Sequence, residues 1–343
     1  MGPARELGGA DALDDEGGLA GIDDGEGRGG ADQAGRHQKQ DRERSESSGS
    51  SGDGSKHEDM WWETPHCGRS GPRVGRPKEA PSPRGDPMTE QPPEQPPALP
   101  PHQTLTTYYD SDPERSAYVH ALFKRTAHHY DTIEKIFGNG GLLYRRYSLR
   151  MNGLRPGMKV LDVAIGTAAV ACGAAKEVGP TGQVFGVDPN EGMLGEARKK
   201  FDGPLTRGVA QQLPFKSDTF DFVTMGIALR HVSDLKATFC EYHRVLKPGG
   251  RLWILEGHVA KSRIGHALTR FVWAKAIPGL TLAFTGSRDA KLLMDYYWDT
   301  VEQCVPEEQI VAAIASAGFE DPRVRVTMPG AFCEYKGRKA LAS

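Results

Sequence analysis

Aromatic residues are almost absent from the first third of this 343-residue chain. Residues 1–107 contain no Phe or Tyr, and their only aromatic side chains are those of Trp61 and Trp62. Gly, Pro, Ser, Asp, Glu and Arg dominate instead, and such a segment cannot bury enough apolar surface to offset the entropy of ordering the chain. We therefore predict a disordered extension over 1–107 and a folded domain over 108–343.

The chain also lacks the patterns of membrane-spanning, nucleic-acid-binding and metal-binding proteins. No apolar run approaches the roughly 18 residues that a membrane span needs, and the net charge of −2 provides no basic field for nucleic acid. The five cysteines form no C-x-x-C pair, so we expect reduced thiols and no metal site. Because the first residues are acidic and Gly-rich, they resemble neither a secretory signal nor a transit peptide. We expect a cytoplasmic protein, in peripheral contact at most with the inner face of a membrane, and Met88 is an alternative start that would leave 1–87 dispensable.

Strands and helices alternate over the middle of the chain. Apolar runs predict strands at 159–164, 183–187, 205–209, 221–226 and 251–256, and helical periodicity predicts helices near 168–177, 191–201 and 235–246. Gly and Pro mark turns at 179–182 and 247–250. This alternation predicts an α/β fold with a doubly wound, mostly parallel sheet.

The flanking segments follow a different pattern. Asp112, Pro113 and Glu114 form a helix start, with Asp112 as the cap, and a second helix is predicted over 142–151. After the sheet, helices are predicted near 262–276, 289–301 and 307–317. Two short strands between 323 and about 336 then predict an antiparallel hairpin at the edge of the sheet.

The most informative segment joins the first two strands. Val160 to Val163 enter a turn that contains one glycine, Gly166, and the second strand ends on Asp188. A dinucleotide site needs the G-x-G-x-x-G turn, which is missing, whereas a carboxylate at this strand end suits a ribose diol. The pattern therefore predicts a nucleoside cofactor without a pyrophosphate, such as a sulfonium nucleoside.

Further motifs lie on both sides of this unit. They are Ala127-x-x-Tyr130-Asp131, Leu213-Pro214-Phe215, Phe220-Asp221, Leu229-Arg230-His231-Val232-x-Asp234, the turn at 244–250 and Ala317-Gly318-Phe319. With the segment 160–167, they make the chain resemble a class I S-adenosylmethionine-dependent methyltransferase, and more narrowly the ubiquinone/menaquinone-biosynthesis C-methyltransferases. The Leu-Arg-x-Val-x-Asp element is specific to the quinone family, whereas the turn at 244–250 occurs in many class I methyltransferases.

The resemblance implies S-adenosylmethionine as cofactor and a role for each matching position. The methionine end would be held by Thr167 and the backbone at Ala164 and Gly166, the ribose by Asp188, and the adenine would lie beside Val209 and Ala210, with Gly226 under the cofactor. The turn departs from the usual Gly-Gly-Thr-Gly at Ile165 and Ala168. Val209 and Gly226 also replace polar residues, and each lost contact costs about 0.5–1.5 kcal/mol.

The acceptor side would be lined by Tyr130, Arg230 and His231. Methylation of a ring carbon needs a quinol that has lost a hydroxyl proton, so Arg230 would stabilise the phenolate or polarise a water that takes the proton. His231, which stands where the family has Asn, titrates near neutral pH and is a candidate base, and Tyr130 would orient the acceptor oxygen. The alternatives are structural: an ion pair of Arg230 with Asp234, and core packing of the other two.

Residues 258–301 predict a lid over a hydrophobic acceptor, opposite a helical cap at 112–152. Apolar residues there alternate with Lys261, Arg263, Arg270 and Lys275, which also fits a basic contact with a membrane surface or a solvated helix packed on the domain. We expect a C-methyltransferase acting on an aromatic ring or quinol, with a prenylated quinol as the narrower expectation. An O- or N-methyltransferase of another hydrophobic molecule and a non-catalytic scaffold remain alternatives, and a homo-oligomer or a biosynthetic complex stays open.

Overall fold

The computed structural model describes residues 98–136, 140–328 and 331–342. The predicted extension up to 97 therefore lies outside the described residues. The helices are α2 (Asp112–Thr126), α3 (Tyr130–Ile136), α4 (Gly140–Met151), α5 (Ala169–Val178), α6 (Glu191–Ala197), α7 (Leu235–Val245), α8 (Arg263–Phe271), α9 (Ile277–Thr285), α10 (Arg288–Glu302) and α11 (Glu307–Ser316). The strands are β1 (Lys159–Val163), β2 (Gln183–Asp188), β3 (Leu205–Arg207), β4 (Phe220–Gly226), β5 (Leu246–Gly257), β6 (Phe319–Met328) and β7 (Phe332–Lys339).

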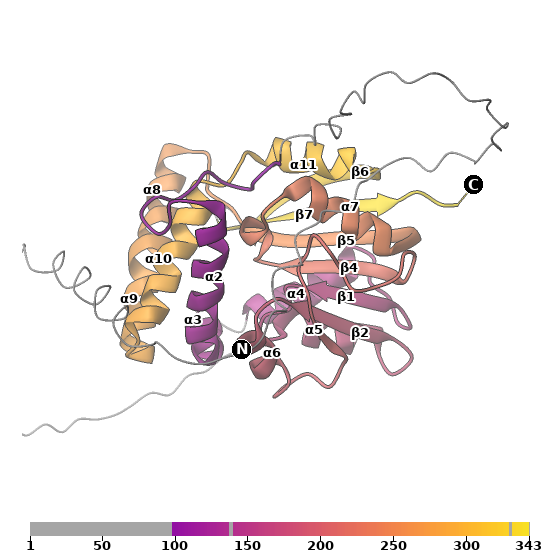
Figure 1. The fold of residues 1–343 in the computed structure, drawn as a ribbon, viewed down its shortest axis with the longest axis horizontal. Helices are drawn as coiled ribbons and strands as arrows, with labels where there is room; N and C mark the ends of the chain where they lie inside the picture. The colour runs from indigo at the N-terminus through magenta and orange to yellow at the C-terminus, as the bar shows by residue number, and fades with distance from the viewer. Residues whose placement is uncertain (1–97, 137–139, 329–330, 343) are drawn as a thin grey trace, which may run out of the picture. The chain divides into compact units, whose positions relative to one another are not determined.

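A seven-stranded sheet in the order β3-β2-β1-β4-β5-β7-β6 forms the centre of the domain (Figure 1). The first five strands run parallel, and β7 pairs antiparallel with both β5 and β6. Both the doubly wound sheet and the closing hairpin are thus confirmed. Because the parallel strands share a direction, the ends of β1, β2, β4 and β5 meet along one edge, where ligands bind in open α/β sheets.

The two faces of the sheet are covered by different helices because side chains alternate along each strand. Val160 of β1 and Phe222 of β4 pack with residues of α4, α5 and α6. Leu161 and Val223 point the other way and pack with residues of α7 and α11. Burial of these apolar side chains, at about 25 cal/mol per Å² of apolar area, holds the three layers together.

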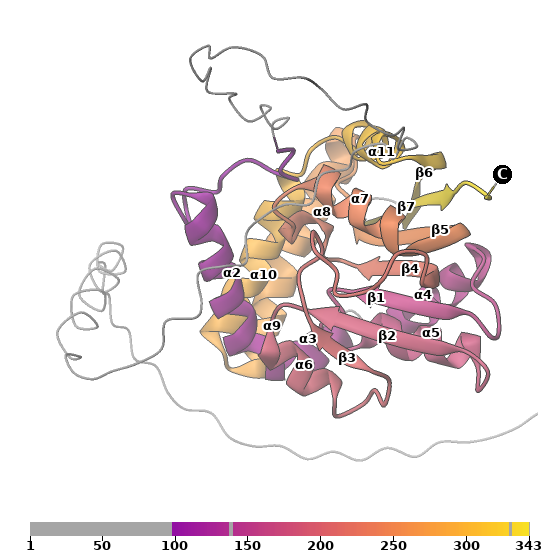
Figure 2. The ribbon, with the colours of Figure 1, turned by 45° about the vertical axis from the view of Figure 1, so that its right-hand side comes forward.

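A separate helical layer lies beside the sheet (Figures 1 and 2). It contains α2, α3 and α8 to α10. Residues of α2, α3, α9 and α10 share a core of apolar side chains with Trp273, which lies in the turn between α8 and α9. The helix from 263 to 285 is continuous, because a π-helical turn over Val272–Ala276 joins α8 to α9. This wider turn accommodates Pro278, which lacks an N–H, so the chain stays helical beyond the predicted end at 276. In the part of the chain that the structure describes, no helix is both long and apolar enough to cross a membrane.

The cap of α2 corrects one predicted detail. Ser111, rather than Asp112, caps the helix, since its hydroxyl accepts a hydrogen bond from the Glu114 N–H at 3.5 Å.

A second correction concerns the predicted turn at 247–250. These residues lie inside β5 and bulge between the partners of Phe220 and Phe222, with Gly249 at φ +77°.

Two packing details refine the domain plan. The segment 98–107 packs on the domain, because Leu99 O accepts from Leu235 N at 2.9 Å and Pro101 O accepts from Val305 N at 2.8 Å. Helix α4, predicted as part of the cap, packs instead with α5 on the sheet.

Candidate active site

The turn after β1 lies at the carboxyl edge of the sheet and has an unusual backbone. Ala164, Gly166 and Ala168 have φ values of +53°, +57° and +67°. Only glycine adopts this region without strain, so two alanines are held there by the surrounding packing. A Cβ on Gly166 would meet nothing closer than the Ala164 carbonyl at 4.0 Å, which leaves open space directly above the turn.

Two residues that depart from the pattern of the resembled family, Ile165 and Gly226, are explained by packing. Ile165 is buried, and its side chain fills the space over Gly186, where a Cβ would overlap it. Gly226, at the end of β4, is needed because a Cβ there would lie 2.6 Å from Cγ2 of Val170. Neither change closes the space above Gly166. Residues Val209 and Ala210 lie in the loop after β3, where Gln212 N donates to Val209 O at 3.2 Å.

Asp188 ends β2 and faces this turn. One carboxylate oxygen accepts from Gly166 N at 3.0 Å and the other from Asn190 N at 2.8 Å. Burial raises the pKa of Asp188 to about 6, although these two N–H groups lower it. The carboxylate is therefore ionised at neutral pH, and each oxygen keeps a lone pair for a further donor such as a ribose hydroxyl.

Asp162 was used in the sequence only to measure spacing, and the structure makes it a site residue. It lies in β1 and is buried, and neither carboxylate oxygen has a partner that meets hydrogen-bond geometry. Burial raises the pKa of Asp162 well above its ordinary value, although the Ala171 N–H of α5 lowers it. A buried carboxyl group whose oxygens lack well-formed hydrogen bonds indicates a place where a ligand or water belongs. Together with the space above Gly166 and the carboxylate of Asp188, it fits a cationic nucleoside cofactor.

Arg230 follows β4 in a short 3-10 turn and is only 2% exposed. Its guanidinium forms an ion pair with Glu256, donates through Nε to Thr300 Oγ1 at 2.9 Å, and lies 3.9 Å from the centre of the Tyr297 ring. Nη1 also donates to Ile227 O at 3.2 Å, whereas Nη2 has no acceptor among the described residues. Arg230 therefore offers one amino group, with two N–H donors, at the carboxyl edge.

The structural alternative predicted an ion pair of Arg230 with Asp234. Arg230 does form an ion pair, but with Glu256. Asp234 instead caps α7, where it accepts from Lys236 N at 2.9 Å. Arg230 pairs with Glu256 because Arg230 follows β4 and Glu256 lies near the end of β5, the neighbouring parallel strand.

The backbone around Arg230 is held by a second arginine that the sequence did not suggest. Arg115 of α2 is buried and donates to the carbonyls of Arg230 and Val232, each at 3.0 Å. This contact links the helical layer to the turn that carries Arg230.

His231 lies between Phe123 and Tyr296, with ring centres 5.1 Å and 5.7 Å away. Both ring nitrogens are buried without a hydrogen-bond partner among the described residues. Burial, together with the nearby charges of Arg230 and Arg115, holds the pKa of His231 well below 6.5. The ring is therefore neutral at physiological pH and resists taking up a proton.

Tyr130 begins α3 and brings a phenol to the same region. Burial raises the pKa of its hydroxyl, and the charges of Arg230 and Asp188 act on it in opposite directions. Tyr130 thus stays protonated between the two halves of the site.

Sequence reasoning missed Glu256 and Tyr297. Glu256 could have been found, because it is the last residue of the strand predicted at 251–256 and lies one residue before the end of β5, much as Asp188 ends β2. Tyr297 could not, since α10 brings it to Arg230 only through the tertiary fold.

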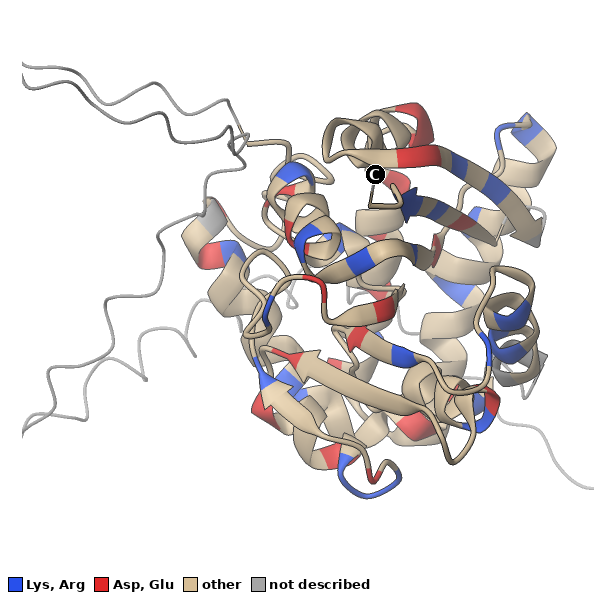
Figure 3. Ribbon diagram, turned by 90° about the vertical axis from the view of Figure 1, so that its right-hand side faces the viewer, with Lys and Arg blue, Asp and Glu red and all other residues tan. Residues whose placement is uncertain are grey.

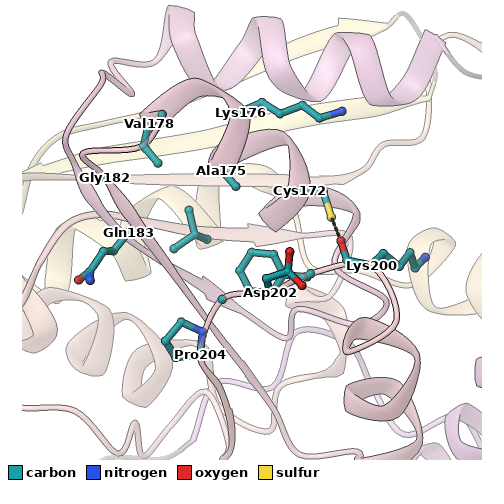
Figure 4. A pocket seen from close by; sticks show the side chains of 13 residues that line it. Cys172, Ala175, Lys176, Val178, Gly182, Gln183, Lys200, Asp202 and Pro204 are labelled. Atoms are coloured by element: carbon teal, nitrogen blue, oxygen red, sulfur yellow. Dashed lines mark hydrogen bonds between the residues drawn. The ribbon is translucent and has the colours of Figure 1, made fainter.

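A surface groove of about 610 Å³ lies at the opposite end of the sheet (Figure 4). It is bounded by the second half of α5, the start of β2 and residues 200–204, with Lys176, Lys200 and Asp202 in its wall. It contains none of the predicted site residues.

Comparison with known proteins agrees with this geometry. Residues 111–339 match the ubiE/COQ5 methyltransferase family. The demethylmenaquinone methyltransferase of Symbiobacterium thermophilum is 33% identical over 239 residues, which cover 67% of this chain and 95% of that protein. The ubiquinone/menaquinone biosynthesis C-methyltransferase UbiE of Geobacter sulfurreducens is 32% identical over 236 residues, or 66% and 91% of the two chains.

A solved structure supports the fold alone. The [4+2]-cyclase SpnF superposes with a TM-score of 0.50 at 16% identity, covering 66% of this chain and 97% of that one. From the family match, the sheet order and the residues at its carboxyl edge, we conclude that the chain belongs to the ubiE/COQ5 family of S-adenosylmethionine-dependent methyltransferases.

Proposed function

We propose that this enzyme methylates a ring carbon of an aromatic quinol that carries an apolar tail, as a step of quinone biosynthesis. The observation that carries the proposal is the free Nη2 of buried Arg230, which lies among aromatic rings at the carboxyl edge of the sheet. The names of the relatives at about 30% identity support the same class of acceptor.

The cofactor half would hold S-adenosylmethionine by the groups already described. Asp188 would accept from the ribose hydroxyls, and Asp162 would face the positive end of the methionine part, beside Thr167 and the backbone of Ala164 and Gly166. Val209 and Ala210 would flank the adenine, with Gly226 beneath. When bound, the cofactor supplies an electrophilic methyl group.

On the acceptor side, Arg230 would donate from Nη2 to the quinol oxygen. A phenolate there is stabilised by a permanent cation, because the guanidinium does not lose its proton. The phenolate electrons move onto the ring carbon, which forms the new bond, and the ring proton leaves to water. In a buried site this charge pairing is stronger than in bulk solvent.

Tyr130 would orient the acceptor, since its protonated hydroxyl can donate to the same oxygen. His231 was a candidate base, but its burial, together with the nearby charges of Arg230 and Arg115, disfavours an imidazolium. We therefore assign the removal of the quinol hydroxyl proton to a water held at Arg230. His231 would line the site as a neutral imidazole that can accept a hydrogen bond.

The test is the lipid content of a strain that lacks the gene. The proposal expects a quinone without one ring methyl group to accumulate, and to disappear when the wild-type gene is restored. Restoration with Arg230→Lys, which keeps the buried cation but loses the second amino group, should not complete the quinone. A normal quinone pool in the deletion strain contradicts the proposal.

A further inference from the structure

The outer face of the helix from 263 to 285 is apolar and exposed. Its large apolar residues recur every three or four positions on either side of the π-helical turn. They are Ile264, Leu268, Phe271, Val272, Leu280 and Phe284, all exposed. Trp273 and Ile277, on the same helix, point inward to the helical core. Exposed apolar side chains gathered on one helix indicate an interaction surface.

The charges on this helix have one sign. Residues 263–285 contain no Asp or Glu, and the three cations Arg263, Arg270 and Lys275 are exposed. By contrast, acidic and basic residues are mixed on the side of the domain that faces the viewer in Figure 3, away from α8 and α9. Glu302 of α10 lies against His266. The helix itself contributes only cations beside its apolar face, which is complementary to a lipid surface that carries negative headgroups.

A second copy of the chain fits this face less well. In a two-fold dimer the same surface patch is used by both copies, so the interface would gather six cations from the two helices and no carboxylate from either helix. Like charges placed opposite each other across an interface disfavour association.

The inner side of the same helix reaches the candidate active site. Trp273 stacks on Tyr297 with ring centres 5.0 Å apart and planes 7° from parallel, and Tyr297 lies under the guanidinium of Arg230. One helix therefore separates the exposed apolar face from the proposed acceptor site.

We propose that the outer face of residues 263–285, the lipid-facing helix, docks this enzyme on a bilayer with anionic headgroups. Arg263, Arg270 and Lys275 attract the headgroups, while the exposed apolar side chains enter the interface. Delivery of a tailed acceptor past Trp273 rests on the proposed function, but the docking itself does not.

The primary test is co-sedimentation of the full chain with vesicles of phosphatidylcholine alone or mixed with phosphatidylglycerol. We expect binding to the mixed vesicles at low salt, weakened by high salt. The pair Leu268→Ser and Phe271→Ser should weaken binding about tenfold or more, as should Arg270→Glu with Lys275→Glu.

The chain offers matched controls for both pairs. Leu143 and Met151 of α4 are 67% and 62% exposed, close to the 63% and 62% of Leu268 and Phe271. Around them Arg146 and Arg150 both pair with Glu177, so the cations of α4 on that side carry an acidic partner. Leu143→Ser with Met151→Ser should therefore keep vesicle binding, and so should charge reversal at the exposed Lys236 and Arg325.

Three outcomes overturn the docking proposal. One is no binding of the wild-type chain to mixed vesicles, and another is equal loss in the α4 control pair. The third is a dimer in light scattering that Leu268→Ser with Phe271→Ser dissociates without any vesicle binding, which assigns the face to a second copy.

Activity separates this inference from the proposed function. The face variants should methylate a short-tailed, water-soluble demethylated quinol at the wild-type rate and lose turnover only of a long-tailed acceptor in vesicles. If no quinol is methylated while vesicle binding persists, the proposed function fails and the docking surface stands.

Discussion

The two halves of the candidate active site are built in different ways. The cofactor half consists of a turn and a strand end that are close in sequence, so Gly166 N bonds directly to Asp188. The acceptor half is assembled from distant elements, because Arg230 depends on Glu256 of β5, Thr300 of α10 and the Arg115 side chain of α2. We infer that a substitution in the cofactor half disturbs mainly its neighbours in the sequence. A substitution in the acceptor half also disturbs the packing between the sheet and the helical layer.

The largest expected effect is therefore at Arg230. Arg230→Ala leaves the carboxylate of Glu256 buried without its partner, which should lower the free energy of unfolding by about 3–5 kcal/mol. Denaturant unfolding measures this, and turnover should be lost.

The double variant Arg230→Met with Glu256→Leu distinguishes stability from chemistry. Removal of both charges should recover most of the lost stability, while turnover stays absent. Recovery of activity in the double variant would exclude the proposed role of the guanidinium.

The next effect concerns Asp188 and the cofactor. Asp188→Asn removes the charged acceptor for the ribose and should weaken S-adenosylmethionine binding by about ten- to a hundredfold in calorimetry. In the wild type the bound cofactor needs the ionised carboxylate, so affinity should fall as the pH drops through about 6, the raised pKa of Asp188. The Asn variant should lose this pH dependence, and an unchanged dependence would place the titrating group elsewhere.

A smaller effect is expected at Asn190, which joins the cofactor half to the helical layer. Its side chain caps α6 by accepting from Gly192 N at 3.0 Å, and it donates to His120 O of α2 at 2.8 Å. Asn190→Ala should cost about 1 kcal/mol of stability and also weaken cofactor binding. The control Ser287→Ala removes the cap of α10 and should cost similar stability without changing cofactor affinity.

The smallest effect is predicted at His231. Because its pKa lies well below 6.5, the ring does not titrate above that pH. The pH dependence of turnover for His231→Asn should then match that of the wild type. An acidic limb, with turnover falling as the pH drops, that disappears only in the variant would restore His231 as the base.

The same contrast explains what the sequence could predict. Strand β1, which leads into the turn at Gly166, and strand β2, which ends at Asp188, follow from apolar runs and turn residues, which are local signals. The partner of Arg230 was wrong because i,i+4 spacing favoured Asp234, whereas sheet pairing selects Glu256. Neither Arg115 nor Tyr297 has a local signal, since each acts through a contact between layers. The cytoplasmic location, the roles of Tyr130 and His231 and any biosynthetic partner stay predictions.

The central claim is methyl transfer to carbon at a site between Asp188 and Arg230. Incubation of the full chain with methyl-labelled S-adenosylmethionine and a short-tailed demethylated quinol, followed by NMR of the product, tests it most directly. We predict that the label appears on a ring carbon and that Arg230→Lys abolishes it without preventing cofactor binding. Label on an oxygen atom, or an unlabelled quinol beside tightly bound cofactor, would contradict the account.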